Sequence, residues 1–195
     1  MYKLIGSRAS RALRPLWMLE EIGAEYEHVP AKPRSPEAQA ANPSGKVPAM
    51  LAEGGAITDS TAILTYLADR HGKLTHPAGS LARGQQDALM FRLLDEVEPL
   101  LWAAAKHSFI FPEELRVAEV KPAMIAEYQR VIPGIATALE GPFLMGEEMT
   151  VPDIILTHCL GWAERAGFPD PGEALTAYRA RLEARPAFQR AAALP

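Results

Sequence analysis

The chain is poor in cysteine, and this scarcity excludes several kinds of protein. Its 195 residues include a single cysteine, Cys159. An internal disulfide framework is therefore impossible, which fits a reducing compartment. The N-terminal part of the chain holds no cysteine at all, which argues against a disulfide reductase of the thioredoxin type. We expect Cys159 to be a small, buried core residue.

Basic residues are also in the minority. Lys and Arg number 20 against 24 Asp and Glu, so the formal net charge is −4. Proteins that bind nucleic acids usually carry a basic surface, and this composition gives that function no support. Any site for an anion must therefore be built locally. No two histidines stand at metal-ligand spacing with a third partner, so we also expect no metal.

Long apolar runs are absent as well. No run approaches the roughly 20 residues that cross a bilayer, and residues 1–5 lack the features of a signal peptide. We therefore expect a cytoplasmic protein that does not bind membranes. The hydrophobic share of 48% and the charged share of 23% are ordinary for globular proteins. The length suits one large domain or two small ones.

The N-terminal part alternates strand and helix patterns. Residues 2–6 and 26–29 predict strands on either side of an amphipathic helix that begins near Leu13 and stops at Gly23. This order favours a right-handed βαβ unit with parallel strands. A weak helix over 35–41, a hairpin around Glu53-Gly54-Gly55 and a clear helix from Ser60 to His71 follow. Residues 1–75 are thus predicted to form a βαβ–ββα domain.

Residues 72–80 read as a linker, because they hold two glycines, a proline and little periodicity. Everything after the linker has helical spacing, so residues 81–195 are predicted to form an all-helical domain. Residues 113–140 predict a long helix that Pro122 and Pro133 bend or divide. Residues 149–154 predict a helix start. Thr150 is the expected N-cap, and Asp153 is expected to bond back to the Thr150 N–H and complete a capping box.

A first candidate segment is residues 42–50, which read NPSGKVPAM. A proline directly before an inner strand is unusual, because proline cannot donate to the strand ladder. A cis Val47–Pro48 bond would explain it and would leave the backbone groups of Val47 free to pair with an extended peptide. An ordinary trans-proline turn is the alternative.

A second candidate segment is residues 58–63, where a strand ends and a helix begins. Helix N-termini bind carboxylates, and Ser60 would offer both a hydroxyl and an N–H. Asp59 would add a negative charge that suits an ammonium beside the carboxylate. The alternative is that Asp59 and Ser60 only cap the helix.

A third candidate segment is the loop after the first strand, residues 6–11, which reads GSRASR. A hydroxyl here could donate to a thiolate placed over the helix end. Lowering a thiol pKa by about two units takes ~2.7 kcal/mol. A hydrogen bond to a charged group contributes about 1.5–3 kcal/mol, and a helix end adds about 0.3–1 kcal/mol. The alternative is that Ser10 only caps the helix.

These segments, in this order, resemble the cytosolic glutathione transferase superfamily, and the chain is similar to its bacterial, serine-type members. The capping box at 150–153 and the closing residues 185–190, RPAFQR, add to the resemblance. It covers essentially the whole chain. It implies a thioredoxin-like first domain, an all-α second domain, a homodimer, and glutathione as the co-substrate with a small apolar electrophile as the second substrate.

The resemblance also implies roles for individual residues. Val47, before cis-Pro48, would pair with the cysteinyl backbone of glutathione. Asp59 and Ser60 would hold the γ-glutamyl group. The glycine carboxylate would contact Lys46, and Trp102, His107 and Phe109 would line the electrophile pocket. Trp162 is a further candidate for that pocket, with core or interface packing as the favoured alternative.

One position departs from the family pattern. Many serine-type members have their catalytic serine at the position of Ala9, counted back from the end of the first helix. The nearest hydroxyls are those of Ser10 and Ser7. We expect Ser10 to activate the thiol, with Arg11 as a supporting or alternative donor, while a shift of the loop would transfer the role to Ser7. An Arg-Ala-Ser run here argues against the maleylacetoacetate isomerase branch.

The leading hypothesis is therefore an enzyme that adds the glutathione thiolate to small apolar electrophiles. Glutathione-dependent isomerisation or peroxide reduction on the same site is an alternative. The departure at Ala9 keeps open a third interpretation, a glutathione-binding module without catalysis. Binding without turnover would distinguish it.

Overall fold

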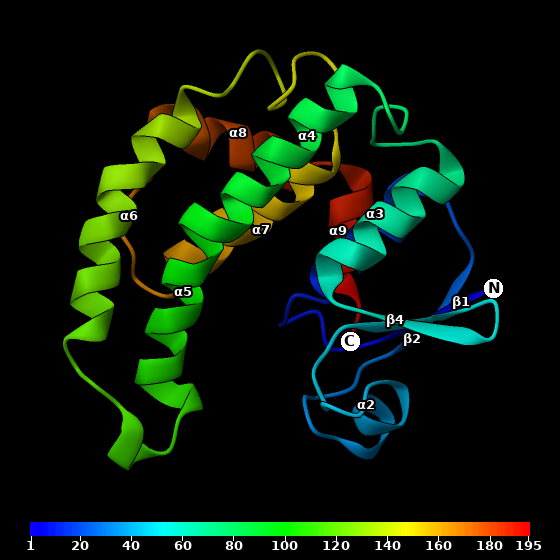
Figure 1. The fold of residues 1–195 in the computed structure, drawn as a ribbon, viewed down its shortest axis with the longest axis horizontal. Coiled ribbons are helices and arrows are strands. Elements are labelled where there is room, and N and C mark those ends of the chain that lie inside the picture. Colours follow the sequence, from blue (N-terminus) through cyan, green and yellow to red (C-terminus); the bar gives the residue numbers. More distant parts are fainter. The chain divides into compact units, whose positions relative to one another are not determined.

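The structure is a computed structural model that describes residues 1–195 (Figure 1). The chain divides into two compact units. The first comprises residues 1–78 together with 182–195, and the second comprises residues 79–181. Each unit has its own buried core, and each is described separately below.

The first unit contains a four-stranded mixed sheet with the strand order β2-β1-β3-β4. β1 pairs in parallel with β2, as the βαβ pattern predicted, and β3 pairs antiparallel with both β1 and β4. Leu4 and Met50, which face each other across β1 and β3, are fully buried. The strands are β1 (Tyr2–Ile5), β2 (Tyr26–Val29), β3 (Ala49–Ala52) and β4 (Gly55–Thr58).

The helices of this unit begin and end at the expected signals. α1 ends at Gly23, which adopts a left-handed conformation with φ 70°. Ser35 caps α2 by accepting a hydrogen bond from the Ala38 N–H. The helices are α1 (Leu13–Ile22), α2 (Pro36–Ala41), α3 (Ser60–His71) and α9 (Pro186–Ala193). The predicted thioredoxin-like βαβ–ββα fold is confirmed.

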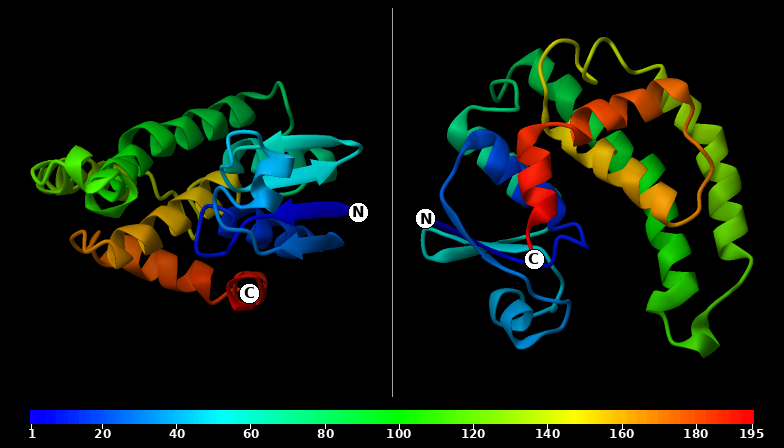
Figure 2. Two further views of the ribbon diagram at one scale, coloured as in Figure 1. Left: turned by 90° about the horizontal axis from the view of Figure 1, so that it is seen from below. Right: turned by 180° about the vertical axis from the view of Figure 1, so that it is seen from behind.

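The position of α9 differs from the expected division of the chain. Residues 81–195 were expected to form the helical domain, but α9 packs against α1 in the first unit (Figure 2). The rings of Trp17 and Phe188 meet edge to face at 5.0 Å between centroids. Arg185 makes two hydrogen bonds to the Glu21 carboxylate, at 2.6 and 2.8 Å. Helical periodicity reports a buried face but does not identify the helix that covers it.

We expect Arg185→Ala to lower the free energy of unfolding by about 1–2 kcal/mol at neutral pH, because it removes a two-pronged ion pair. Burial alone would raise the pKa of Glu21, but hydrogen bonds from Arg185 and Trp17 hold that pKa below its ordinary value of 4.5. A carboxyl whose pKa is lowered by folding stabilises the fold above its unfolded pKa and loses that effect as the pH falls through the folded pKa.

The effect of Arg185→Ala should therefore shrink between pH about 7 and pH about 3, as measured by urea unfolding. Arg190→Ala is the matched control, since Arg190 is more exposed and makes one 2.6 Å ion pair with Glu20. Its cost should stay below about 1 kcal/mol. Equal costs of Arg185→Ala at both pH values would contradict the ion-pair explanation.

The second unit is built from helices alone. The predicted segment 113–140 is divided, but a short 3₁₀ turn and a loop make the division, and Pro133 is accommodated inside α6. The elements are α4 (Leu81–Arg92), π-helical η1 (Leu93–Val97), α5 (Glu98–Ala105), π-helical η2 (Lys106–Ile110), 3₁₀ turn η3 (Glu113–Leu115), α6 (Val120–Ala136), α7 (Val151–Arg165) and α8 (Glu173–Glu183). The predicted fold class, an α/β thioredoxin-like domain with an all-helical second part, is confirmed.

α7 is the central helix of the second unit, and almost all of its residues are buried. The capping box predicted for Thr150 and Asp153 is present. Cys159 is fully buried on this helix, as predicted. No helix combines the length and apolar character of a membrane span. No cluster of three or more His, Cys, Asp or Glu side chains is arranged to hold a metal ion.

Candidate functional site

The three candidate segments all belong to the first unit, and Gly6 brings two of them together. Gly6 follows β1 and has a φ of +146°. A Cβ at this position would lie 2.7 Å from Ala12 Cβ and 3.2 Å from Val47 Cβ. Side chains do not fit at such distances, so only glycine allows this approach. The loop that carries Ser7 and Ser10 is therefore packed directly against the segment Val47–Pro48.

Hydrogen bonds within the β1–α1 loop separate the roles of its two serines. The Ser10 hydroxyl donates to the Ser7 carbonyl at 2.7 Å and accepts from the Ala12 N–H at 3.1 Å. Ser7 Oγ accepts from the Ala9 N–H at 3.3 Å. A hydroxyl has one proton to donate. The Ser10 hydroxyl thus donates its hydrogen bond within the loop. The Ser7 hydroxyl only accepts there, so its proton is available to another partner.

The loop before β3 is held by Asn42, which the sequence analysis did not single out as a site residue. Its side-chain amide donates to the Lys46 carbonyl at 3.1 Å, and its Oδ1 accepts from the N–H and the hydroxyl of Ser44. Val47–Pro48 is a cis peptide bond, as predicted. Pro48 is buried and Lys46 is exposed. The asparagine two residues before a serine was a readable signal for such a side-chain turn.

At the start of α3, Asp59 caps the helix and Ser60 keeps its own donors. Asp59 Oδ1 accepts from the N–H groups of Thr61 and Ala62, at 2.8 and 3.1 Å, so Asp59 caps the helix. Asp59 also has a φ of 78°, which is strained for a residue with a side chain. Ser60 is 2% exposed and opens the helix, where its own N–H has no intrahelical acceptor. Capping by Asp59 therefore leaves the donors of Ser60 available.

Two further residues of this unit contact the candidate segments. His28 Nε2 donates to the Gly6 carbonyl at 2.9 Å, which fixes the end of β1. Arg14 Nη1 donates to Ser60 Oγ at 3.3 Å, although 46 residues separate the two. Neither pairing could be read from sequence spacing, because each depends on how the sheet and α1 pack.

The candidates for the electrophile pocket lie in the second unit and have different surroundings. Trp102 on α5 meets Trp162 of α7 edge to face at 6.4 Å between ring centroids. His107 Nδ1 accepts from the Val117 N–H at 3.1 Å, while Phe109 is 65% exposed. His107 and Phe109 both belong to the π-helical segment η2, a kind of segment that is frequent at functional sites.

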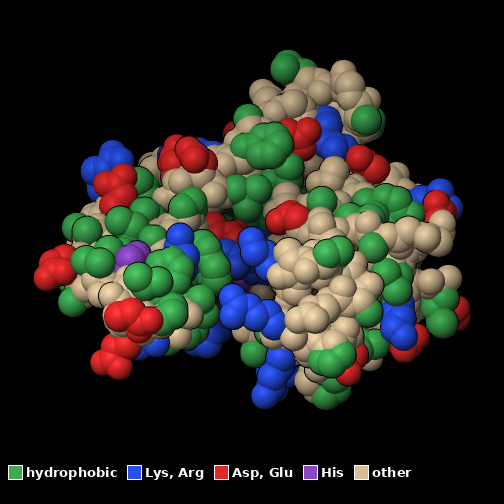
Figure 3. Space-filling model, turned by 60° about the horizontal axis from the view of Figure 1, so that its bottom comes forward, with side chains coloured by type: hydrophobic (Ala, Val, Ile, Leu, Met, Phe, Trp, Pro, Cys, Tyr) green, Lys and Arg blue, Asp and Glu red, His purple; other side chains and the backbone are tan.

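Charges of both signs reach the surface. The chain has a net charge of −4, and Figure 3 shows Lys and Arg side chains (blue) as well as Asp and Glu side chains (red) on the face that it draws.

Comparisons with known proteins agree with this geometry. Residues 10–70 match the family described as glutathione S-transferase, N-terminal domain. The probable glutathione S-transferase GSTF2 of Oryza sativa subsp. japonica is 28% identical over 98% of this chain and 96% of its own length.

Solved structures give the same result over the whole chain. A glutathione transferase from Methylococcus capsulatus is 27% identical with a TM-score of 0.85, covering 98% of this chain and 97% of its own. A glutathione transferase family member from Pseudomonas fluorescens, described with two glutathione bound, is 25% identical with a TM-score of 0.81, covering 100% and 93%. The N-terminal part of the chain thus matches the glutathione S-transferase family, and the whole chain is similar to glutathione transferases in sequence and in fold.

Proposed function

We propose that this protein is a glutathione transferase that binds glutathione in its first unit and adds the thiolate to small apolar electrophiles. The observation that carries the proposal is the packing of Gly6 against Val47 and Pro48. It holds a serine-bearing loop beside a segment whose backbone can pair with an extended peptide. The glutathione bound to the Pseudomonas fluorescens relative supports the same ligand.

The proposed glutathione site uses the residues predicted from the sequence. Val47 pairs with the cysteinyl backbone beside cis-Pro48, and the exposed Lys46 meets the glycine carboxylate. Ser60 donates to the γ-glutamyl carboxylate, and the capping carboxylate of Asp59 faces the ammonium. Each partner is a charge or hydrogen-bond complement of a different part of the tripeptide.

We assign thiol activation to Ser7 rather than to the predicted Ser10, because only Ser7 has an uncommitted hydroxyl proton. Ser10 and Arg11 then shape the loop over the start of α1. The thiol releases its proton to solvent, and the sulfur lone pair forms the new bond to the electrophile. In the same step a π bond of the electrophile opens and its carbon takes a proton from solvent, or the bond to a leaving group breaks and that group departs with the electron pair. A hydrogen bond to the thiolate of about 1.5–3 kcal/mol lowers the thiol pKa by about one to two units.

The helical unit provides the proposed contacts to the electrophile from Trp102, His107 and Phe109. Their aromatic faces suit a small apolar molecule. Trp162 supports the ring of Trp102. Holding both reactants in one orientation supplies a large part of the rate enhancement in reactions of this kind.

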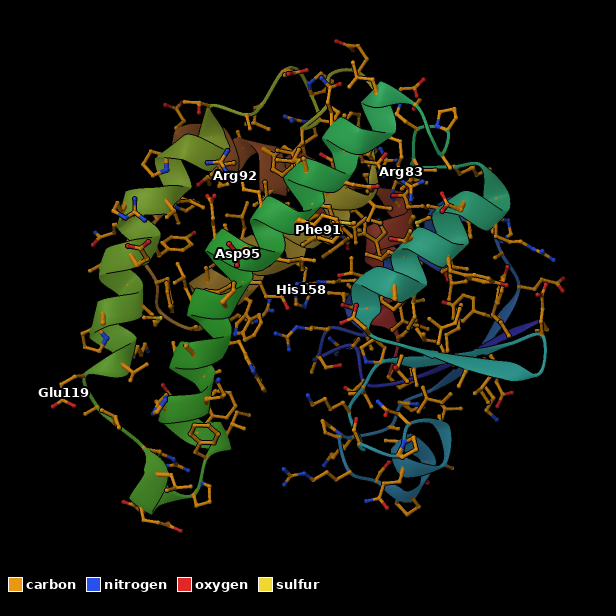
Figure 4. The ribbon with its side chains drawn as sticks, in the orientation of Figure 1. Arg83, Phe91, Arg92, Asp95, Glu119 and His158 are labelled. Atoms are coloured by element: carbon orange, nitrogen blue, oxygen red, sulfur yellow. The ribbon has the colours of Figure 1, made fainter.

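We also propose a homodimer, in which α4 contacts the second copy. Leu81 is 80% exposed and Phe91 is 60% exposed on this helix, and Phe91 is labelled in Figure 4. Contiguous exposed apolar surface is typical of interaction sites, and both side chains would contribute to it. Sedimentation of the wild type and of Phe91→Glu tests this part, and a monomeric wild type would contradict it.

The function is tested by calorimetry of glutathione binding, followed by ultraviolet absorbance of the bound thiolate across pH. We expect a bound thiol pKa about two units below the free value of about 8.5. Ser7→Ala should raise it again by at least about one unit and lower kcat/KM about 10- to 100-fold. Ser10→Ala should change the thiol pKa less, and Thr176→Ala, which removes an exposed hydroxyl of α8, should change nothing.

The possible contrary results separate the alternatives. A larger effect of Ser10→Ala would return the role to Ser10. Binding with an unshifted thiol pKa would favour the second candidate, a glutathione-binding module without catalysis, which the engaged Ser10 hydroxyl and the alanine at position 9 already suggest. A wild type that does not bind glutathione would contradict both functions.

A further inference from the structure

Arg14 is a charged side chain buried in the first turn of α1. It is 1% exposed, and its neighbours on this helix, such as Leu16 and Met18, are apolar. Arginine is almost never fully buried unless it has partners, because removing a charge from water is costly. A large apolar residue would fill the same space without that cost. The groups that this guanidinium contacts therefore decide what the buried charge does, and Ser60 is one of them.

The contact with Ser60 determines the direction of a hydrogen bond. Arg14 Nη1 lies 3.3 Å from Ser60 Oγ. A guanidinium can only donate, so Ser60 Oγ must be the acceptor. One lone pair of the Ser60 oxygen is thereby occupied, and its own proton points away from Arg14. A Ser60 hydroxyl held in this state is a donor to any further partner.

The groups around Ser60 favour an anion as that partner. Asp59 uses Oδ1 to cap the N–H groups of Thr61 and Ala62. The donors left at the start of α3 are the N–H and the hydroxyl of Ser60, at the positive end of a helix dipole. Arg14 adds a full positive charge directly behind this hydroxyl. A carboxylate at Ser60 would thus meet two donors and a buried cation.

We propose that Arg14 is a positioning residue that fixes the Ser60 hydroxyl as a donor and selects a carboxylate at the start of α3. The inference rests on the proposed function, in which this carboxylate is the α-carboxylate of the γ-glutamyl group. Arg14 also belongs to the helix that the Ser7 loop leads into, and its N–H donates to the Arg11 carbonyl at 3.2 Å. The contact with Ser60 and the end of the thiol-activating loop thus both lie at the start of α1.

The test compares glutathione with a derivative whose γ-glutamyl α-carboxylate is a primary amide. Affinities of both are measured by calorimetry for the wild type, Arg14→Met, Arg14→Lys, Ser60→Ala and the double variant Arg14→Met/Ser60→Ala. Arg70→Met is the matched control, because it removes one cation from the same unit at an exposed site on α3. Circular dichroism and thermal unfolding establish that each variant folds.

Arg14→Met should weaken glutathione binding about tenfold or more and the amide derivative less than about threefold. Arg14→Lys should recover part of the preference for the carboxylate. Adding Arg14→Met to Ser60→Ala should cost little further affinity, because both changes remove the same interaction. Arg70→Met should leave both affinities unchanged.

Equal losses for the two ligands, or additive losses in the double variant, would overturn the proposal, since a purely structural role would act on both ligands alike. If Arg14→Met does not fold, Arg14→Lys provides the test. A ratio of the affinities for glutathione and the amide derivative that equals the wild-type ratio would then overturn the proposal. A wild type that binds no glutathione would defeat the proposed function itself. Loss of affinity in Ser60→Ala but not in Arg14→Met would defeat only the role of Arg14.

Discussion

Asp153→Ala is expected to lower the free energy of unfolding by about 3–5 kcal/mol, because it leaves four donors without an acceptor inside the helical unit. The Asp153 carboxylate is fully buried. Oδ1 accepts from the Leu144 N–H at 2.9 Å and from the Tyr178 hydroxyl at 2.8 Å. Oδ2 accepts from the N–H and the hydroxyl of Thr150, at 2.7 and 3.0 Å.

The expected loss of stability in Asp153→Ala comes from removing hydrogen-bond acceptors, not from removing a negative charge. Burial raises the pKa of Asp153 above its ordinary value, although hydrogen bonds from Leu144, Thr150 and Tyr178 oppose the rise. A carboxyl whose pKa is raised by folding contributes less to stability as the pH rises through the folded pKa. Ionisation alone therefore disfavours the fold. Asp153→Asn keeps one acceptor oxygen but turns an NH₂ toward two of the donors. We therefore expect it to lower the free energy of unfolding by about 2–3 kcal/mol, less than Asp153→Ala does.

Urea unfolding followed by circular dichroism measures these costs. Tyr178→Phe removes one of the four donors and should cost about 1 kcal/mol. Glu173→Ala, at an exposed acidic position in the first turn of α8, is the control and should stay within about 0.5 kcal/mol of the wild type. An Asp153→Ala variant as stable as Tyr178→Phe would show that the network does not anchor the unit.

The capping box illustrates what the sequence could predict and what it could not. Thr150 and Asp153 were identified together because the motif is local, and a spacing of three residues is visible in the sequence. Tyr178 was not connected with Asp153, because 25 residues separate them and only the packing of α8 on the unit brings them together. The contact between Arg14 and Ser60 and the placement of α9 could not be predicted for the same reason.

The candidate glutathione site was likewise predicted only in part from the sequence. The cis Val47–Pro48 bond was predicted, with an ordinary trans turn as the alternative, because a proline directly before an inner strand cannot donate to the strand ladder. The sequence led us to expect Ser10, with Ser7 as the alternative in the same short polar loop. The proposed change to Ser7 depends on a single hydrogen bond, from the Ser10 hydroxyl to the Ser7 carbonyl. Residue types predict which chemistry a loop can perform, and backbone geometry decides which atom performs it.

Gly6→Ala is expected to lower the free energy of unfolding by about 2–4 kcal/mol and to abolish glutathione binding at concentrations that saturate the wild type. The φ of +146° is unfavourable for any residue with a Cβ. The new Cβ would also lie 2.7 Å from Ala12 Cβ and 3.2 Å from Val47 Cβ, so one of these segments must move. Either movement separates the Ser7 loop from Val47, which is the contact on which the proposed site depends.

Gly54→Ala distinguishes this contact from backbone strain. Gly54 has a φ of +80° in the β3–β4 turn, and a Cβ there would meet nothing within 4 Å. Its cost should therefore be about 1 kcal/mol, with glutathione affinity unchanged. Unfolding and calorimetry of both variants separate the two effects. If Gly6→Ala bound glutathione like Gly54→Ala, the approach of the loop to Val47 would not form the site, and the proposal would lose the observation that carries it.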